Sequence, residues 1–387
     1  MENKSNKYLI PVLCLLIACL VGFLAYNAGK NSVSNSLNEK EETINELLEN
    51  RELLYQLNRD SIENIGIEEG KTVYVIGHKS PDTDTVCSAI AYARLLNMLG
   101  YKAEARINGS AVNKETALVL TEAGVEIPEE LIDASGENIF LVDHSEYTQS
   151  TDGMDDAHIV GILDHHGIGN VTTGHQVVYE AKPIGATATI VWLDYMNYGL
   201  DLDKQTAYIL LGAVLSDTTN LTATTVTEAD KVALEKLSEI AEVEDVDALY
   251  RRMREQALSY EGMSNEEILF SDYKEYEAYG TKYGIGLVNS IDENSSKQLA
   301  SRMKEALTEY FSTRDVDLMY ASVGIREDGV KIDYVIPANE LSESILKNAF
   351  PDYDEYDGTS YIFRSGLGRK SKFVPGLDDY LGAHPHE

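Results

Sequence analysis

Residues 73–84 have the sequence VYVIGHKSPDTD, and this stretch decides the fold class. Its first four residues are apolar and stop at Gly77, as a short buried strand does. A polar loop follows, and helical periodicity then runs from Ser88 to Leu99. A strand that passes through a tight loop into a helix begins a β-α unit, so we predict a parallel sheet with polar residues along its edge.

The same pattern recurs in the rest of a first domain, predicted at 69–250. Two further apolar runs, 139–142 and 159–163, each end at an aspartate, and helical patterns lie at 114–123 and 207–215. Strands that alternate with helices predict a mostly parallel α/β sheet covered on both faces. In such sheets ligands bind beyond the carboxyl ends of the strands, which is where the acidic and histidine residues fall.

A smaller α+β domain is predicted at 261–387. A polar connection at about 240–260 separates it from the first domain. Its predicted elements are strands at 283–288, 317–325 and 330–336 and a helix near 295–311.

The first 30 residues predict a membrane anchor. Residues 8–26 form a run of 19 without a charge, which is long enough to cross a hydrocarbon layer of about 30 Å. Lys4 and Lys7 precede the run and favour a single-pass anchor with the bulk of the chain outside, but a lysine also follows the run and weakens this prediction of orientation. Two alternatives share this basic-then-apolar start: a lipoprotein cleaved before Cys19 and a cleaved signal peptide.

Residues 31–68 predict a polar helical stalk. Leu37, Ile44, Leu47 and Leu54 recur at roughly helical spacing. Two interpretations stay open, a single stalk helix and a weak parallel coiled coil of two copies.

Composition limits the function classes. The 387 residues include 32 Lys and Arg and 65 Asp and Glu, for a formal net charge of -33. Such a field repels phosphate backbones, so we exclude nucleic acid as a partner. The three cysteines form neither a disulfide framework nor a zinc motif.

The loop after the first strand offers metal ligands. His78, Asp82 and Asp84 supply one imidazole and two carboxylates, a mixture that suits Mn²⁺, Co²⁺ or Mg²⁺ better than a thiolate-binding metal. Pro81 restricts the turn that orients Asp82. One aspartate could instead cap the following helix, but that interpretation leaves the histidine unexplained.

Further acidic and histidine residues follow the later apolar runs. They are Asp143-His144, Asp164-His165-His166 and Asp217. A single Asp-His pair is usually a loop hydrogen bond, but several such clusters at one sheet edge would repel one another without cations. A carboxylate shared between two metals about 3.5–4 Å apart is the arrangement that activates a hydroxide and clamps a phosphoryl group.

The combined pattern resembles the family II, manganese-dependent inorganic pyrophosphatases of the DHH phosphoesterase superfamily. The resemblance covers about residues 71–387. The matching segments are 77–78, 81–84, 88–93, 112–116, 141–144, 164–166, 187–190, 216–217 and 369–375. It implies a DHH metal-binding domain followed by a DHHA2 substrate-binding domain, with pyrophosphate held between them.

The resemblance also implies roles for individual residues. One metal would be held by His78, Asp82 and Asp143, and the other by Asp84, Asp143, His165 and Asp217. His166 would contact the substrate. Lys274, Arg369 and Lys370 would neutralise phosphate charge.

This sequence departs from the family's usual pattern at several positions. Gly368 precedes the Arg-Lys pair, and Gly167 follows the two histidines. Ser145, Ala186 and the polar segment 218–222 are also unusual. These positions bear on substrate affinity and specificity, since the predicted ligands are all present.

We therefore predict an enzyme that hydrolyses pyrophosphate to two phosphates with a hydroxide activated by two metals. Mn²⁺ or Co²⁺ would occupy both sites, and Mg²⁺ would arrive with the substrate. The alternatives are a membrane-anchored polyphosphatase or nucleotide phosphodiesterase, and a catalytically weak phosphate-binding protein. A homodimer is left open.

Overall fold

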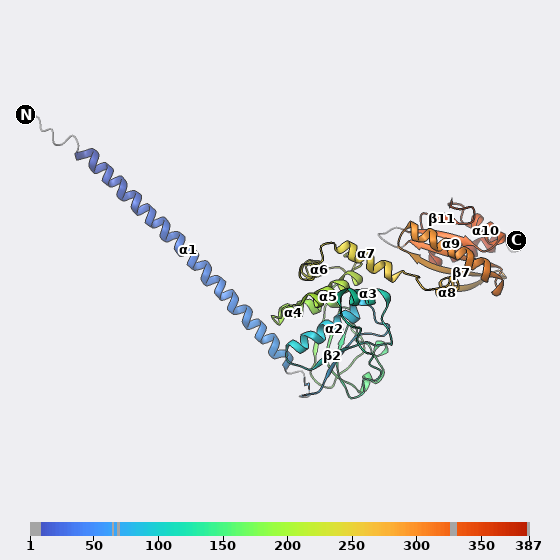
Figure 1. Cartoon of the computed structure of the whole chain (residues 1–387), viewed down its shortest axis with the longest axis horizontal. Coiled ribbons are helices and arrows are strands. Elements are labelled where there is room, and N and C mark those ends of the chain that lie inside the picture. The colour runs from blue at the N-terminus through green and yellow to red at the C-terminus, as the bar shows by residue number, and fades with distance from the viewer. Residues whose placement is uncertain (1–8, 64–65, 68–69, 326–330, 385–387) are drawn as a thin grey trace, which may run out of the picture. The chain divides into compact units, whose positions relative to one another are not determined.

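The structure is a computed structural model that describes residues 9–63, 66–67, 70–325 and 331–384, apart from the side chains of 9–19, 24–25 and 31–37 (Figure 1). The chain forms two compact units. The first comprises Met1–Ala111 and Pro128–Val243, and the second comprises Val112–Ile127 and Glu244–Glu387.

A five-stranded sheet organises the first unit. Its strands follow the order β2-β1-β3-β4-β5, and every neighbouring pair is parallel. From β1 the chain first adds β2 on one side of the sheet and then adds β3 on the other side. The strand order therefore switches between β1 and β3, and a ligand site is expected at the carboxyl ends of these two strands. The strands are β1 (Val73–Ile76), β2 (Ala103–Arg106), β3 (Asn138–Val142), β4 (His158–Asp164) and β5 (Val178–Ala181).

The central strands are buried on both faces, as in a sheet covered by helices. α2 packs against α4, α5 and the first two strands. Asp82 caps α2 by accepting a hydrogen bond from the backbone N–H of Thr85, and Asp203 caps α5 in the same way through Thr206. The helices of this unit, after α1, are α2 (Thr83–Met98), α4 (Thr187–Asn197), α5 (Lys204–Asp217) and α6 (Glu228–Ala241), with short 3₁₀ turns at Tyr147–Gln149 and Met154–Asp156.

A six-stranded mixed sheet organises the second unit. The order is β10-β11-β9-β8-β7-β6. Among the described strand pairs of this second sheet, only β7–β8 is parallel. The strands are β6 (Tyr273–Ala278), β7 (Thr281–Ser290), β8 (Leu318–Ile325), β9 (Ile332–Pro337), β10 (Asp354–Glu355) and β11 (Tyr361–Phe363).

Two apolar cores fill the second unit. α8 and α9 contribute to one, and α10 and α11 contribute to the other. α3 groups with this unit because it packs on α7. The helices are α3 (Lys114–Ala123), α7 (Val246–Ala257), α8 (Asn265–Ser271), α9 (Glu293–Tyr310), α10 (Glu340–Ala349) and α11 (Val374–Ala383), with a 3₁₀ turn at Phe311–Thr313 and a π-helical turn at Arg369–Phe373.

The α/β part of the predicted fold agrees with this architecture, but the predicted anchor at 8–26 is wrong. Tyr8 lies outside the described residues, and the run after it begins one continuous helix, α1 (Leu9–Glu63). Within the described part of the chain, no helix is long and apolar enough to cross a membrane. The predicted single-pass localisation and membrane partner are corrected with it.

Candidate metal centre

The predicted ligands of the first unit meet at the carboxyl edge of its sheet. His78 follows β1, and Asp82 and Asp84 lie at the start of α2. Asp143 follows β3, and His165 follows β4. Asp217 joins them from the end of α5. The sheet topology therefore brings together side chains that are up to 139 positions apart in the sequence.

Asp143 lies at the centre of the cluster. Its backbone is left-handed, with φ of 63°, and its side chain is almost completely buried. Thr85 Oγ1 donates to Oδ2 at 2.6 Å, and Thr187 Oγ1 donates to Oδ1 at 2.9 Å. The two hydroxyls fix the carboxylate with one oxygen toward each side of the site.

Each oxygen of Asp143 faces a different histidine. Oδ2 lies 3.4 Å from His78 Nε2, and Oδ1 lies 3.4 Å from His165 Nε2. Around these contacts the structure groups His78, Asp82 and Asp143, and separately Asp84, His165 and Asp217, with ligand atoms within 4.8 Å of one another. Metal–ligand bonds of about 2.1 Å place neighbouring ligand atoms about 3.0–3.4 Å apart, so the spacing fits two metal ions.

His165 supplies an independent test of this fit. Its Nδ1 is 3.0 Å from the carbonyl of Ile184, which makes Nδ1 the protonated nitrogen. Nε2 is buried and makes no hydrogen bond to any residue that the structure describes. It lies 3.5 Å from Asp217 as well as near Asp143. A buried lone pair directed between two carboxylates is the arrangement of a metal-ligating histidine whose other nitrogen is held by a carbonyl.

Asp84 is held by the first turn of α4. The backbone N–H groups of Thr187 and Ala188 donate to its carboxylate at 2.6 and 2.8 Å, and Ser88 Oγ donates at 3.1 Å. Ala186 occupies the N-cap position of α4 and has no polar side chain to cap it. The carboxylate of Asp84 therefore takes the place of the missing cap.

Asp230 fixes the approach to that turn. This fully buried carboxylate accepts from the Gly185 N–H at 2.9 Å and from Thr189 Oγ1 at 2.7 Å. It also accepts two hydrogen bonds of 2.8 Å from the backbone and the hydroxyl of Thr227. A continuous set of hydrogen bonds thus runs from α6 through the start of α4 to Asp84.

The charges in the site are unbalanced without cations. Burial, followed by repulsion from Asp143 and Asp217, raises the pKa of Asp84 well above its usual range. Burial and the charges of Asp143 and Asp82 raise the pKa of Asp217 to about 8. Burial disfavours the charged form of His78, but hydrogen bonds to Asp143 and Asp82 outweigh it and raise its pKa to about 11. Bound cations would replace these protons.

His166 differs from its neighbour because it is half-exposed. Asp164 accepts from its backbone N–H at 2.9 Å, and Nδ1 lies 3.0 Å from the same carboxylate oxygen. This hydrogen bond outweighs partial burial and raises the pKa of His166. Ser145 holds the other oxygen of Asp164 at 3.0 Å. Ser145, one of the unusual positions, therefore supports the orientation of His166.

The unusual segment after Asp217 has an uncommon backbone. Thr219, Asn220 and Leu221 have φ values of 49°, 50° and 63°, a left-handed turn built without glycine. Such a run is costly for ordinary residues. Thr218 Oγ1 stabilises the turn by accepting from the N–H of Leu221 at 3.1 Å.

The three predicted cations of the second unit have different surroundings. Lys274 on β6 and Lys370 on the π-helical turn are exposed. Arg369 is buried and donates to both the carbonyl and the carboxylate of Asp272 at 2.7 Å. The guanidinium therefore ties this turn to the beginning of β6, two residues before Lys274.

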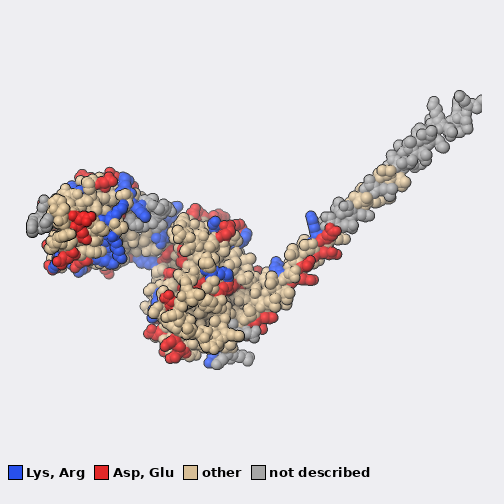
Figure 2. Space-filling view, turned by 180° about the vertical axis from the view of Figure 1, so that it is seen from behind, with Lys and Arg blue, Asp and Glu red and all other residues tan. Residues whose placement is uncertain are grey.

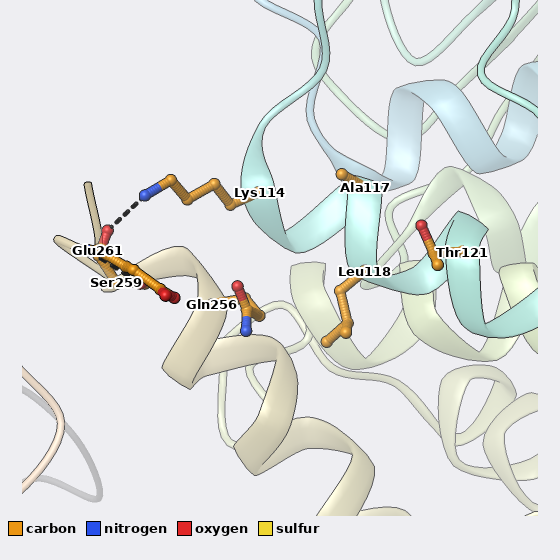
Figure 3. A pocket seen from close by; sticks show the side chains of 7 residues that line it. All are labelled: Lys114, Ala117, Leu118, Thr121, Gln256, Ser259 and Glu261. Carbon is orange, nitrogen blue, oxygen red and sulfur yellow. Dashed lines mark hydrogen bonds between the residues drawn. The ribbon is translucent and has the colours of Figure 1, made fainter. Parts of the chain in front are cut away.

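A surface pocket of about 450 Å³ lies between α3 and α7 (Figure 3). Lys114 donates across it to the carbonyl of Ser259 at 2.8 Å. Lys114 belongs to the matching segment 112–116, and this contact gives it a structural role. It secures the first turn of α3 to the chain that follows α7.

Sequence reasoning did not predict the hydrogen bonds that support the proposed ligands, although it singled out Ser145 and Asp164 for other reasons. The supporting residues are Thr85, Ser88, Ser145, Asp164, Thr187 and Asp230. Thr85 and Ser88 follow the first motif within one helical turn, which is a usable signal. The role of Asp230 depends on contacts across 45 positions, and no local pattern marks it.

Two protein-family models match this chain. Residues 72–214 match the model of the DHH family, N-terminal domain, and residues 251–379 match that of the DHHA2 domain. A probable manganese-dependent inorganic pyrophosphatase of Archaeoglobus fulgidus is 34% identical over 79% of this chain and 97% of its own length. A manganese-dependent inorganic pyrophosphatase of Methanothrix thermoacetophila is 33% identical over the same shares.

A solved structure is also similar. The crystal structure of a putative family II inorganic pyrophosphatase of Methanococcus jannaschii is 31% identical and covers 80% of this chain and 99% of that one, with a TM-score of 0.49. The sequence relatives match across both family domains and along almost their whole length. The chain therefore belongs to the family of manganese-dependent inorganic pyrophosphatases, which combine a DHH domain with a DHHA2 domain.

Proposed function

We propose that this chain hydrolyses inorganic pyrophosphate to two phosphates, with Mn²⁺ at two adjacent sites. The observation that carries the proposal is the position of Asp143, whose two oxygens each lie 3.4 Å from a different histidine. A carboxylate shared in this way would hold two metals close enough to act on one phosphoryl group.

The proposed ligand sets follow the two groups around Asp143. His78 and Asp82 complete the first site, and Asp84, His165 and Asp217 complete the second. The imidazole and carboxylate donors suit Mn²⁺ and Co²⁺, while Mg²⁺ would accompany the substrate phosphates. Bound metals would lower the pKa of an attacking water and neutralise phosphate charge.

The protein's own side chains orient and protonate the substrate. His166 is half-exposed, and its raised pKa favours the imidazolium, which can donate a proton or a hydrogen bond to a phosphate oxygen. Lys274 and Lys370 are exposed cations that we assign to phosphate binding. Arg369 would act with them, either directly or by holding the turn that carries Lys370.

The test is phosphate release by the full chain, with Mn²⁺, Co²⁺ and Mg²⁺ compared. Pyrophosphate should be the preferred substrate over tripolyphosphate and a linear dinucleotide at equal concentration. Metal content per chain should approach two after dialysis. A metal-loaded, folded protein that cleaves the longer polyphosphate or the dinucleotide faster would contradict the substrate assignment. A metal content of one would contradict the shared carboxylate.

A further inference from the structure

Both ends of α4, a helix described along its whole length, lack capping side chains of their own. Ala186 has no polar side chain, the first turn contains no acidic residue, and the last turn contains no basic residue. The first turn is held from outside, because the N–H groups of Thr187 and Ala188 donate to Asp84. Thr187 Oγ1 also donates to Asp143 at 2.9 Å. This turn thus contacts two of the proposed ligands, and the position of α4 bears directly on the metal centre.

The last carbonyls of α4 are satisfied from two sources. Those at 194–196 accept hydrogen bonds from backbone N–H groups just after the helix. The next two accept from side chains of α1. Asn58 Nδ2 donates to the carbonyl of Asn197, and Arg59 Nε donates to that of Tyr198, both at 2.8 Å. Since the final carbonyls of a helix have no partner within it, α1 completes the hydrogen bonding at this end of α4.

Arg59 also matches the charge of this helix end. The C-terminus of a helix carries partial negative charge and is stabilised by a nearby cation. Residues 38–63 of α1 contain eight Asp or Glu and three Lys or Arg, and Figure 2 shows the acidic side chains along the described part of this helix. An arginine therefore stands where most charged side chains of α1 would be repelled. As a result, α4 has Asp84 at its positive end and Arg59 at its negative end.

The last turns of α1 are docked on the first unit. Ile62 is 1% exposed, and its carbonyl accepts from Tyr101 Oη at 3.2 Å. The ring of Tyr55 lies against Gly199, where an added Cβ would be 2.5 Å from a ring carbon. α1 precedes residues 72–214, which match the DHH family model, so these contacts are additional to that domain.

We propose that Asn58 and Arg59 are positioning residues of the metal centre. They cap the C-terminus of α4 and thereby hold its first turn against Asp84 and Asp143. α4 is 11 residues long, about 16 Å, and most of its side chains are buried, so its two ends move together. This role rests on the proposed metal site, and it adds to that site a segment outside the matched DHH domain.

Isothermal titration of the full chain with Mn²⁺ tests this role. The variant Asn58→Ala/Arg59→Met removes both donors and keeps an unbranched apolar side chain in place of the arginine stem. The matched control Asn50→Ala/Arg51→Met makes the same changes eight residues earlier on α1, where both side chains are exposed. We expect the first variant to bind Mn²⁺ about 10-fold more weakly and the control to stay within about 3-fold of wild type. Arg59→Lys should keep most of the affinity, because an ammonium group can also donate to the carbonyl.

Amide hydrogen exchange of the metal-free protein separates positioning from local fraying. We expect Asn58→Ala/Arg59→Met to speed exchange at Thr187 and Ala188 as well as at 195–199, with β8 of the second unit unchanged. Faster exchange confined to 195–199, Mn²⁺ affinity within about 3-fold of wild type, or an equal effect in the control would overturn the proposal. A wild type that binds no Mn²⁺ would instead refute the metal site, and exchange at Thr187 and Ala188 would still decide the capping role.

Discussion

Replacing Asp230 by asparagine should weaken manganese binding although Asp230 is not a proposed ligand. Its carboxylate accepts four hydrogen bonds of 2.7–2.9 Å, three of them at Oδ2. An asparagine can keep its oxygen at that position, but each bond changes from a charged to a neutral acceptor. The difference is about 1 kcal/mol per bond, so the two bonds from Gly185 and Thr189 that hold the start of α4 lose about 2 kcal/mol together. Loss of such support typically lowers metal affinity 10–100-fold.

Mn²⁺ binding is measured by isothermal titration calorimetry, and the thermal midpoint of unfolding is measured for each variant. Asp245→Asn is the matched control, because Asp245 also caps a helix, accepting from the N–H of Ala248 at 2.9 Å, and that helix, α7, carries no proposed ligand. Both variants should lower the thermal midpoint, and only Asp230→Asn should weaken Mn²⁺ binding. Saturating Mn²⁺ should restore most of the pyrophosphate turnover of Asp230→Asn. Equal Mn²⁺ affinity in wild type and Asp230→Asn would refute the proposed support of Asp84 through α4.

Three further predictions follow from the same geometry. Asp143→Ala should abolish pyrophosphate hydrolysis and reduce bound Mn²⁺, measured by elemental analysis, since both proposed sites share this residue; near-normal turnover would contradict the two-metal assignment. Lys370→Ala should leave Mn²⁺ content unchanged and lower kcat/KM roughly 10–150-fold, the equivalent of a charge-assisted contact, whereas Lys282→Ala, which removes an exposed pair with Asp315, should have no effect. Burial raises the pKa of Asp194 to about 7, against the opposing effect of Lys182. Because the folded pKa lies above the unfolded one, its stabilising contribution is lost as pH rises toward and through 7. Asp194→Asn should therefore raise the thermal midpoint at pH 8 relative to wild type, and less so at pH 5; a pH-independent difference would contradict the raised pKa.

The central strands, and the acidic and histidine residues that follow them, could be located in the sequence because burial leaves a strong apolar pattern. β1 and β3 are apolar throughout most of their length, and each is followed by a proposed ligand. The edge strands β2 and β5 were missed since they are only partly buried and carry charged residues. An edge strand has one side without a neighbour, so its sequence need not be continuously apolar.

The supporting hydrogen bonds could not be predicted for a different reason. Thr187 lies 103 positions after Asp84, and only the folded sheet places its N–H beside that carboxylate. The grouping of α3 with the second unit likewise depends on packing against α7.

The left-handed backbone of Asp143 limits which amino acids can occupy this position during evolution. Among residues with a side chain, asparagine and aspartate adopt that conformation at the lowest cost. Glutamate, the usual exchange for an aspartate, is less favourable in this left-handed backbone conformation, and its longer side chain would also shift the carboxylate. Asparagine satisfies the backbone but removes the charge. Substitution at this position is therefore limited both by the backbone conformation and by the need for a charged carboxylate. Asp143→Asn keeps the backbone conformation and would give a well-folded inactive protein suited to trapping the intact substrate.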